Sequence, residues 1–362
     1  MDFSLDDDQR LLQDTVQRLV AKDYRFEQRR AYAAEPEGFS RALWAQAADI
    51  GLLGLAYPEA DGGSGRGAVD VMLVMQALGR ALPLDPFLPT MVLGAAALRH
   101  ADAAQRTRRI AAVAAGDCVL AWAGYGCRAR PQGGGWRLDG SADAVLHGDS
   151  ADALLVAARV EAGSDALFIV DARSVGITRA AWRTHDGRRA ADIGFDGVVV
   201  PDDARLGASE VVDAVRQAGI AALAAEAVGA MELALELTVE HLKTRVQFGA
   251  PLARQQALQH RVAEMLINLE QTRSMAMYAA LMLDEPDAAG RATALSAVKV
   301  QVGRAARFVG QQAVQLHGGI GVTDECAVGH VLKRLTLLEA EFGGSDQHLA
   351  AVARAGGFVE AA

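Results

Sequence analysis

The sequence predicts an α+β protein with an N-terminal helical domain, a middle antiparallel β domain and a C-terminal four-helix bundle. Changes in periodicity along the chain carry this prediction. Apolar residues recur at helical spacing in the first third, short strand-like runs follow, and long helical patterns return in the second half. Helices set apart from a sheet are typical of the α+β class. We expect domains at residues 1–116, 117–208 and 209–362.

The first domain is expected to be helical throughout. Within Asp6–Val20, leucines and valines recur every three or four residues and form the stripe of an amphipathic helix. Helical patterns continue in Val69–Leu82 and Pro89–Leu98. The glycine-rich segment Gly62-Gly63-Ser64-Gly65 is expected as a loop between these elements.

The middle and C-terminal domains differ in the length and spacing of their apolar runs. Short apolar or alternating runs bounded by Gly and Asp predict strands at Trp136–Gly140, Ala153–Val160, Ala166–Val170 and Ile193–Val200. Longer helical patterns predict helices at Val211–Thr244, Arg254–Leu283 and Ala288–Leu316. Between the last two, Glu285-Pro286 marks a helix boundary, because the residue before proline disfavours the α conformation.

Composition indicates a cytoplasmic protein. The net charge is −9 with no run of basic residues, which argues against nucleic acid as the main partner. The acidic N-terminus is unlike a signal or transit peptide, and acidic residues interrupt the apolar stretches, so no membrane span is expected. The three cysteines have neither metal-ligand nor disulfide spacing, which fits a reducing compartment; they are Cys118, Cys127 and Cys326.

Two segments in the last third suit a dinucleotide, namely Arg245-Val-Gln-Phe-Gly249 and Gln315-Leu-His-Gly-Gly319. The guanidinium of Arg245 is a planar, permanently charged fork that matches a pyrophosphate. Phe248 offers a face to a flat ring, and glutamine amides can donate and accept at a base edge. Gly318-Gly319 allows the backbone to come close to a phosphate or ribose.

Each segment alone is more often a glycine-capped helix end or a plain turn. Together, and followed by Thr323-x-Glu325 and Lys333-Arg334, they resemble the acyl-CoA dehydrogenase family. The resemblance runs the length of the chain and implies this family's fold. It also implies that one subunit holds the ADP half of a FAD whose flavin lies in its neighbour. The implied FAD contacts are Arg245, Phe248, Gln255, Gln256, Gln315, Leu316, His317, Gly318 and Gly319.

The implied reaction is α,β-dehydrogenation of an acyl-CoA thioester, with a glutamate removing the α-proton and an electron-transfer flavoprotein as a further partner. In this chain the family's usual base position falls on Phe342, and the alternative position falls on Gly219. Glu341, one residue early, is the only candidate base within the chain, and it also reads as a solvated surface acid. Glu226 reads as part of the helix interior or of an ion pair.

The segment that lines the flavin ring in relatives is also altered. The usual Trp-Ile-Thr/Ser becomes Ala144-Val145-Leu146, and His147 beside a glycine turn reads as structural. The retained elements are those that one subunit lends to its neighbour, which indicates a heteromer. Three further segments resemble the small subunit of pimeloyl-CoA dehydrogenase, namely Ala225-Glu-Ala-Val-Gly-Ala-Met231, Leu146-His-Gly-Asp149 and Phe342-Gly-x-x-Asp346. Because similar two-component dehydrogenases act on dicarboxylic or ring-bearing acyl-CoAs, the resemblance implies a bulky or ω-polar acyl group.

Three interpretations stay open. The chain is a subunit of a two-component dehydrogenase, a homomeric flavoenzyme with an atypical base, or a flavin-free scaffold with the same fold. Long apolar helices such as Ile220–Leu237 exceed what one bundle face covers. They predict a dimer through the C-terminal helices and a homo- or hetero-tetramer of two such dimers.

Overall fold

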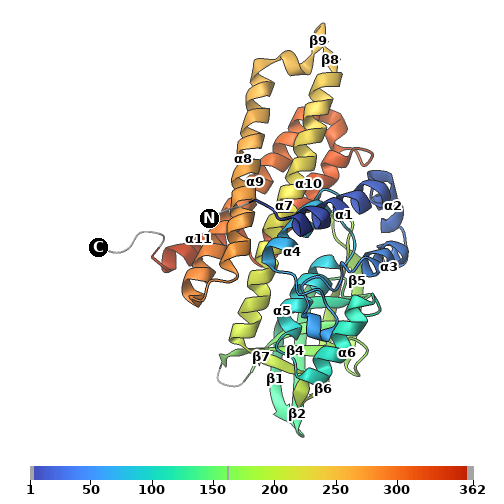
Figure 1. The fold of residues 1–362 in the computed structure, drawn as a ribbon, viewed down its shortest axis with the longest axis vertical. Coiled ribbons are helices and arrows are strands. Elements are labelled where there is room, and N and C mark those ends of the chain that lie inside the picture. Colours follow the sequence, from blue (N-terminus) through green and yellow to red (C-terminus); the bar gives the residue numbers. More distant parts are fainter. Residues whose placement is uncertain (1–3, 161–162, 357–362) are drawn as a thin grey trace. The chain divides into compact units, whose positions relative to one another are not determined.

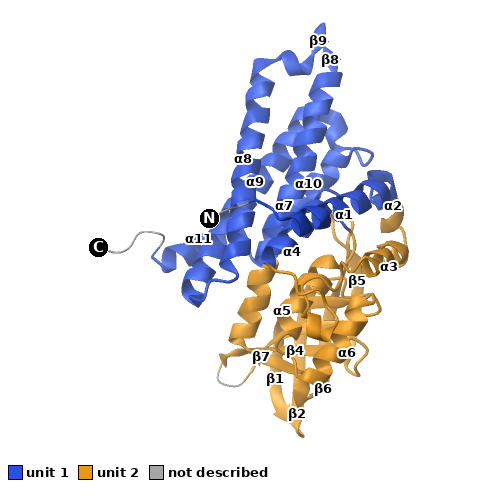
Figure 2. Cartoon of the chain, viewed as in Figure 1, with its two compact units in different colours: residues 1–29, 68–83, 220–362 blue, residues 30–67, 84–219 orange. Residues whose placement is uncertain are grey.

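The computed structural model describes residues 4–160 and 163–356, which form two compact units (Figures 1 and 2). Unit 1 comprises residues 1–29, 68–83 and 220–362, and unit 2 comprises residues 30–67 and 84–219. Helix α7 (Ser209–Thr244) belongs to both, because its first residues lie in unit 2 and Ile220–Thr244 lies in unit 1.

Unit 1 is built mainly from helices, and those of the C-terminal part pack side by side (Figure 2). Helix α9 packs against α8, α10 and α11, and α4 packs against α1 and α8. Besides α7, the elements of this unit are α1 (Asp7–Asp23), the start of α2 (Phe26–Ala33), α4 (Ala68–Gly79), β8 (Val246–Gln247), β9 (Ala250–Pro251), η5 (Leu252–Arg254), α8 (Gln256–Met282), α9 (Ala288–His317), η6 (Gly318–Val322), α10 (Ala327–Ala340) and α11 (Ser345–Arg354).

Local sequence fixes where these helices begin. Helix α1 starts with a capping box, in which the Gln9 backbone N–H donates to Asp6 Oδ1 at 2.8 Å and the Asp6 N–H donates to Gln9 Oε1 at 3.2 Å. Asp287 caps α9 by accepting from the N–H groups of Ala289 and Gly290. Both caps satisfy N–H groups that the first helical turn leaves without partners.

Helices α4 and α7 lie in direct backbone contact. A Cβ atom added at Gly79 would lie 2.2 Å from the Glu226 carbonyl oxygen, and one at Gly229 would lie 2.0 Å from that of Gln76. Only glycine fits at such distances. The segment of α7 around Glu226 is therefore packed on one side by α4.

Unit 2 contains one seven-stranded sheet with the strand order β5-β6-β2-β1-β3-β4-β7. Its strands are β1 (Leu120–Gln132), β2 (Gly135–Leu146), β3 (Ala153–Arg159), β4 (Asp165–Asp171), β5 (Ile177–Arg183), β6 (Arg189–Pro201) and β7 (Arg205–Ala208). Its further helical elements are α3 (Arg41–Asp49), η1 (Glu59–Asp61), η2 (Leu88–Leu93), α5 (Gly94–Leu98), α6 (Ala103–Ala114) and η4 (Asp202–Ala204).

The sheet is antiparallel except for one pair, because β1 and β3 run parallel. The short connection from β2 to β3 ends beside the residue that precedes β1. There the Asp152 N–H donates to the Val119 carbonyl, and the Val119 N–H donates to Asp152 Oδ2. Strand β3 then begins opposite Leu120 and runs in the same direction as β1. The predicted all-antiparallel pairing misses this crossing, which periodicity cannot reveal.

The core of unit 2 comes from the central strands. Six of the seven residues of β3 are buried, and Leu154, Phe168 and Ile193 belong to one apolar cluster. Strands covered on both faces are apolar in continuous runs rather than in alternation. This explains why the sequence reveals β3 and β4 clearly.

Within residues 4–160 and 163–356, one helix is long and apolar enough to span a membrane by length and composition, and it is α7. In its most apolar stretch 78% of the residues are buried inside the protein, as in a core helix. The predicted fold class is confirmed. The change from helices to strands falls between α6 and β1, and the change back falls at Ala208, while the division into three domains stays a prediction.

Candidate functional site

A pocket of about 580 Å³ opens at the end of unit 1 where α7, α8 and α9 terminate or begin. Several of the predicted cofactor residues line it together. Its walls are His241, Arg245, Gln247, Leu252, Leu258, Arg261, Gln315, Leu316, His317, Gly318, Gly319 and Ile320. None of these lining residues carries a carboxylate, so the pocket presents two guanidinium groups and two imidazoles without an acidic neighbour in its wall.

The last turn of α7 and the following hairpin hold Arg245 in place. Its N–H donates to the His241 carbonyl and its own carbonyl accepts from the Leu252 N–H, both at 2.9 Å. Strands β8 and β9 pair between these points, and Phe248 and Gly249 form their two-residue turn with φ of 52° and 78°. A turn with two positive φ values suits the twist of a hairpin, and glycine accommodates it more easily than phenylalanine.

The predicted set divides into two groups. Arg245, Gln315, Leu316, His317 and the Gly318-Gly319 backbone share the pocket, and a Cβ atom added at either glycine would meet no described atom within 4 Å. Phe248 lies at the hairpin tip with 93% of its surface exposed. Gln255 and Gln256 are exposed at the start of α8 and do not line the pocket. These last three residues face solvent in the isolated chain, and their role stays a prediction.

The pocket also includes residues that sequence reasoning missed. His241 lies in the last turn of α7, four residues before Arg245, which directly follows the helix, and this spacing puts both side chains on one side. That spacing is a signal that could have revealed it. Arg261 comes from α8, where its side chain donates to Gln312 Oε1 at 2.7 Å. Its position depends on how two distant helices pack, and no local pattern encodes that.

The histidines of the pocket form a stacked pair. The ring centroids of His241 and His317 lie 4.5 Å apart with an interplanar angle of 25°. His317 Nδ1 lies 2.7 Å from the Ala313 carbonyl oxygen. Burial lowers the pKa of His241 from its ordinary value, and the nearby His317 and Arg245 lower that pKa further.

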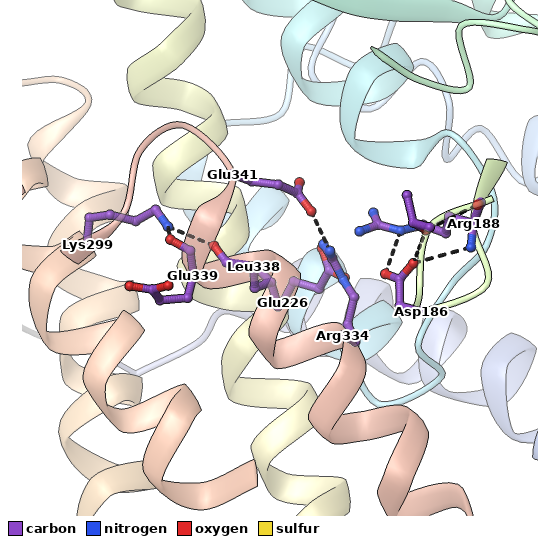
Figure 3. Close-up of polar contacts among 9 residues, drawn as sticks. Asp186, Arg188, Glu226, Lys299, Arg334, Leu338, Glu339 and Glu341 are labelled. Carbon is purple, nitrogen blue, oxygen red and sulfur yellow. Dashed lines mark hydrogen bonds and ion pairs between the residues drawn. The ribbon is translucent and has the colours of Figure 1, made fainter. Parts of the chain in front are cut away.

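A second cluster surrounds Glu341, the candidate base named from the sequence. Arg334 of α10 is 1% exposed and donates through Nε and Nη2 to both carboxylate oxygens of Glu226, at 2.5 and 2.8 Å (Figure 3). Its Nη1 donates to Glu341 Oε1 at 2.5 Å. The expectation that Glu226 belongs to the helix interior or an ion pair is confirmed. Glu341 is not a solvated surface acid, because 15% of its side chain is exposed and Arg334 holds it.

Lys299 supports the same loop from α9. Its Nζ donates to the carbonyl oxygens of Leu338 and Glu339 at 2.7 and 2.8 Å, which satisfies two acceptors in the last turn of α10 (Figure 3). The ammonium group is buried, and this burial lowers its pKa to about 8 despite the nearby carboxylates of Glu341 and Glu339. The loop that follows Glu341 is thus fixed at its start.

Phe342 occupies the position at which the family resemblance places a base. Its φ is 58°, a left-handed conformation that is uncommon for a bulky residue. Its carbonyl lies 3.1 Å from His348 Nε2, which ties the loop to α11. The side chain at this position has no group that accepts a proton, so the cluster contains an organised loop without a free carboxylate.

In unit 2, the segment expected beside a flavin contains small and aliphatic side chains. Ala144 has a φ of 55° and its N–H donates to Asp192 Oδ1 at 2.9 Å. His147 is 2% exposed, its N–H donates to the Arg189 carbonyl at 2.9 Å, and its ring packs edge-on to Phe39 at 6.0 Å. Burial and these contacts favour a structural role for His147, which stays a prediction. Figure 3 also shows a buried ion pair of this unit between Asp186 and Arg188.

The lowered pKa of Lys299 predicts how the free energy of unfolding changes with pH. An unfolded lysine titrates near 10.4 and the folded group near 8, so the unfolded chain binds more protons between these values. The free energy of unfolding should therefore rise through this range, by about 3 kcal/mol from this group. Denaturant unfolding at pH 7.5 and 10 should show this rise in wild type and in Lys243→Met, an exposed control, and lose it in Lys299→Met. An equal rise in all three proteins would contradict it.

Two protein-family models and a curated relative match this chain. The acyl-CoA dehydrogenase N-terminal domain model matches residues 6–117, and the acyl-CoA dehydrogenase C-terminal domain model matches residues 217–357. Acyl-CoA dehydrogenase FadE27 of Mycobacterium tuberculosis is 30% identical over 330 residues, covering 87% of this chain and 88% of that protein.

Two solved structures share the fold over nearly the whole chain. A chain of the ChsE4-ChsE5 complex from Mycobacterium tuberculosis has a TM-score of 0.92 and 26% identity, with 100% of both chains covered. A variant of the steroid ACAD Tcur3481-Tcur3483 has a TM-score of 0.89 and 27% identity, with 96% of this chain and 97% of the other covered. The chain belongs to the acyl-CoA dehydrogenase family, the members of which use FAD as their cofactor.

Proposed function

We propose that this chain is the non-catalytic subunit of a two-component, FAD-dependent acyl-CoA dehydrogenase. In this proposal it binds the ADP half of a FAD whose flavin lies in a partner subunit, and the partner supplies the base that removes the α-proton. The observation that carries the proposal is a contrast within unit 1. The pocket gathers Arg245, Gln315 and the Gly318-Gly319 backbone, whereas the carboxylates near the family's base position are held by Arg334.

The donor set of the pocket fits a diphosphate. Arg245 and Arg261 line one hollow with the exposed Gly318-Gly319 backbone, and no lining residue carries a negative charge that would repel phosphate oxygens. Guanidinium groups bind phosphate through two parallel hydrogen bonds. Gln315 adds an amide that can donate and accept at a base or ribose. When bound, FAD accepts the hydride in this family's reaction, and these residues would hold and orient its nucleotide end.

The loop that begins at Glu341 supports the proposal that the partner supplies the base. A general base has to lie within hydrogen-bond reach of the proton it removes and be available to accept it. Glu341 Oε1 accepts from Arg334, and both oxygens of Glu226 are occupied by the same guanidinium. Phe342 and Gly219 offer no proton acceptor at the two family positions. This arrangement favours a base from the partner.

The relatives support a heteromer with a bulky substrate. One structural relative is a complex of ChsE4 with ChsE5, and another pairs Tcur3481 with Tcur3483 and is described as a steroid ACAD. By analogy we propose a ring-bearing or ω-polar acyl-CoA as the substrate, an electron-transfer flavoprotein as the electron acceptor, and a cytoplasmic location. Helix α8 exposes several large apolar side chains, which fits a tetramer assembled through the C-terminal helices; they are Leu266, Ile267, Tyr278 and Leu281.

Two alternatives keep the fold and change the role. A homomeric flavoenzyme would use Glu341 after its release from Arg334. A scaffold without flavin would keep the pocket for architectural reasons only. The cationic side chains of the pocket argue against the scaffold, which has no need to gather them. The contact between Glu341 and Arg334 argues against the homomer.

Replacing Arg245 with Ala should lower the FAD content of the purified assembly. The change removes the counter-charge of a pyrophosphate, which costs about 2–5 kcal/mol when the pair is buried. FAD released by denaturation should be quantified per assembly. Arg130→Ala is the matched control, because Arg130 is exposed on β1 in unit 2 and does not line the pocket. Equal FAD content in both variants would remove Arg245 from the site.

Replacing Glu341 with Gln should leave the rate of flavin reduction by acyl-CoA close to that of wild type. The amide keeps an oxygen that accepts from Arg334, so the loop stays in place. Loss of a true general base typically slows the reaction about 10²–10⁴-fold. Stopped-flow absorbance measures the rate, and Glu339→Gln controls for disturbance of the same turn. A hundredfold loss confined to Glu341→Gln, with FAD still bound, would support the homomeric alternative.

A further inference from the structure

The stacked histidines give the pocket side chains whose charge can change near neutral pH, which arginines alone would not. His241 lies on α7 and His317 at the end of α9, and their rings overlap at 4.5 Å in the wall that also contains Arg245 and Arg261. The charged and titratable groups of the wall are therefore two permanent cations and two imidazoles. An arginine keeps its charge at any physiological pH, whereas an imidazole titrates near pH 6.5.

A backbone contact decides what His317 can offer to an anion. Its Nδ1 faces the Ala313 carbonyl at 2.7 Å, and a carbonyl oxygen can only accept, so Nδ1 carries the hydrogen. In the neutral ring the other nitrogen, Nε2, is then a lone-pair acceptor that repels a phosphate oxygen. Only the imidazolium form has a hydrogen on Nε2 to donate. His317 becomes an anion donor by taking up a proton.

The surroundings of His241 disfavour its protonated form while the pocket holds no anion. Two stacked imidazoles cannot both be charged without strong repulsion, and Arg245 adds a further positive charge beside His241. Burial and these neighbours lower the pKa of His241. A bound diphosphate reverses this balance, because its negative charge favours the protonated ring.

We propose that His317 is a proton-linked anion donor of this pocket, with His241 as its neutral stacking partner, so that a diphosphate nucleotide binds together with a proton. This inference rests on the proposed ADP-binding function and adds a regulation to it. Acidification should strengthen binding of the nucleotide half of FAD, and alkaline conditions should weaken it.

The sign of the effect follows from linkage. An anion beside an imidazole favours its protonated form, so binding of the diphosphate takes up a proton. The affinity should therefore be highest at low pH and should fall as the pH rises. Uptake of one proton changes the affinity at most about tenfold per pH unit. Arg245 and Arg261 contribute a constant part at every pH in this range.

ADP-ribose is a suitable probe, because both of its phosphates are esterified and its charge is constant near neutral pH. Isothermal titration calorimetry on the full chain, in the assembly in which it purifies, gives the affinity from pH 5.5 to 8. Repeating it in buffers of different ionisation enthalpy counts the protons taken up. Adenosine, which lacks phosphates, controls for recognition of the base and ribose.

Wild type should bind ADP-ribose with uptake of up to one proton, and about tenfold more tightly at pH 5.5 than at pH 7.5. His317→Gln should bind with no uptake and no pH dependence. His241→Phe preserves a ring against His317 and should keep the uptake. His185→Gln, an exposed histidine of unit 2, should match wild type.

Tight but pH-independent binding by wild type would overturn the proton linkage and leave the ADP site standing. Continued proton uptake by His317→Gln would also overturn it. Failure of ADP-ribose to bind at any pH would overturn both the linkage and the proposed ADP site, so the two failures are distinguishable.

Discussion

One guanidinium group determines the chemistry of the helical unit. Arg334 is almost fully buried and binds the carboxylates of Glu226 on α7 and Glu341 at the end of α10. Removing one partner of such a buried pair typically costs about 3–5 kcal/mol, because the remaining charge is left without compensation. The pair therefore fixes the loop that starts at Glu341, and Lys299 secures the helix end beneath it. The same contacts that organise the loop occupy the carboxylates that a base would need.

The pocket lined by His241 and His317 differs from the Arg334 cluster in its balance of charges. In the Arg334 cluster each charge has an opposite partner, whereas the lining of the pocket gathers positive and titratable groups with no carboxylate. Balanced charges stabilise a structure, and unbalanced ones in a hollow favour a ligand of the opposite sign. One bundle thus combines a structural charge cluster with a surface suited to a polyanion. This difference is the physical basis for assigning the chain a nucleotide-holding role without a proton-transfer role.

The sequence predicts most of this fold, for reasons specific to each element. Long apolar periodicity indicates α7, α8 and α9, and continuous apolar runs indicate β3 and β4. Strand β5 was missed because its residues are largely exposed, and the parallel β1–β3 pair was missed because pairing is a long-range property. Of the site, the two glycine-containing motifs were visible as local patterns. Arg261 and the stack of His241 on His317 were not, because helix packing alone brings them together.

The most direct test of the central claim is the visible spectrum of the chain purified alone and after co-expression with a second acyl-CoA dehydrogenase-type subunit. The account predicts a colourless protein that becomes yellow only in the complex, with flavin that acyl-CoA then reduces. A yellow protein from the chain alone, reduced by acyl-CoA, would contradict the division of labour and establish a self-sufficient enzyme. A protein that stays colourless with every such partner would contradict the cofactor role itself.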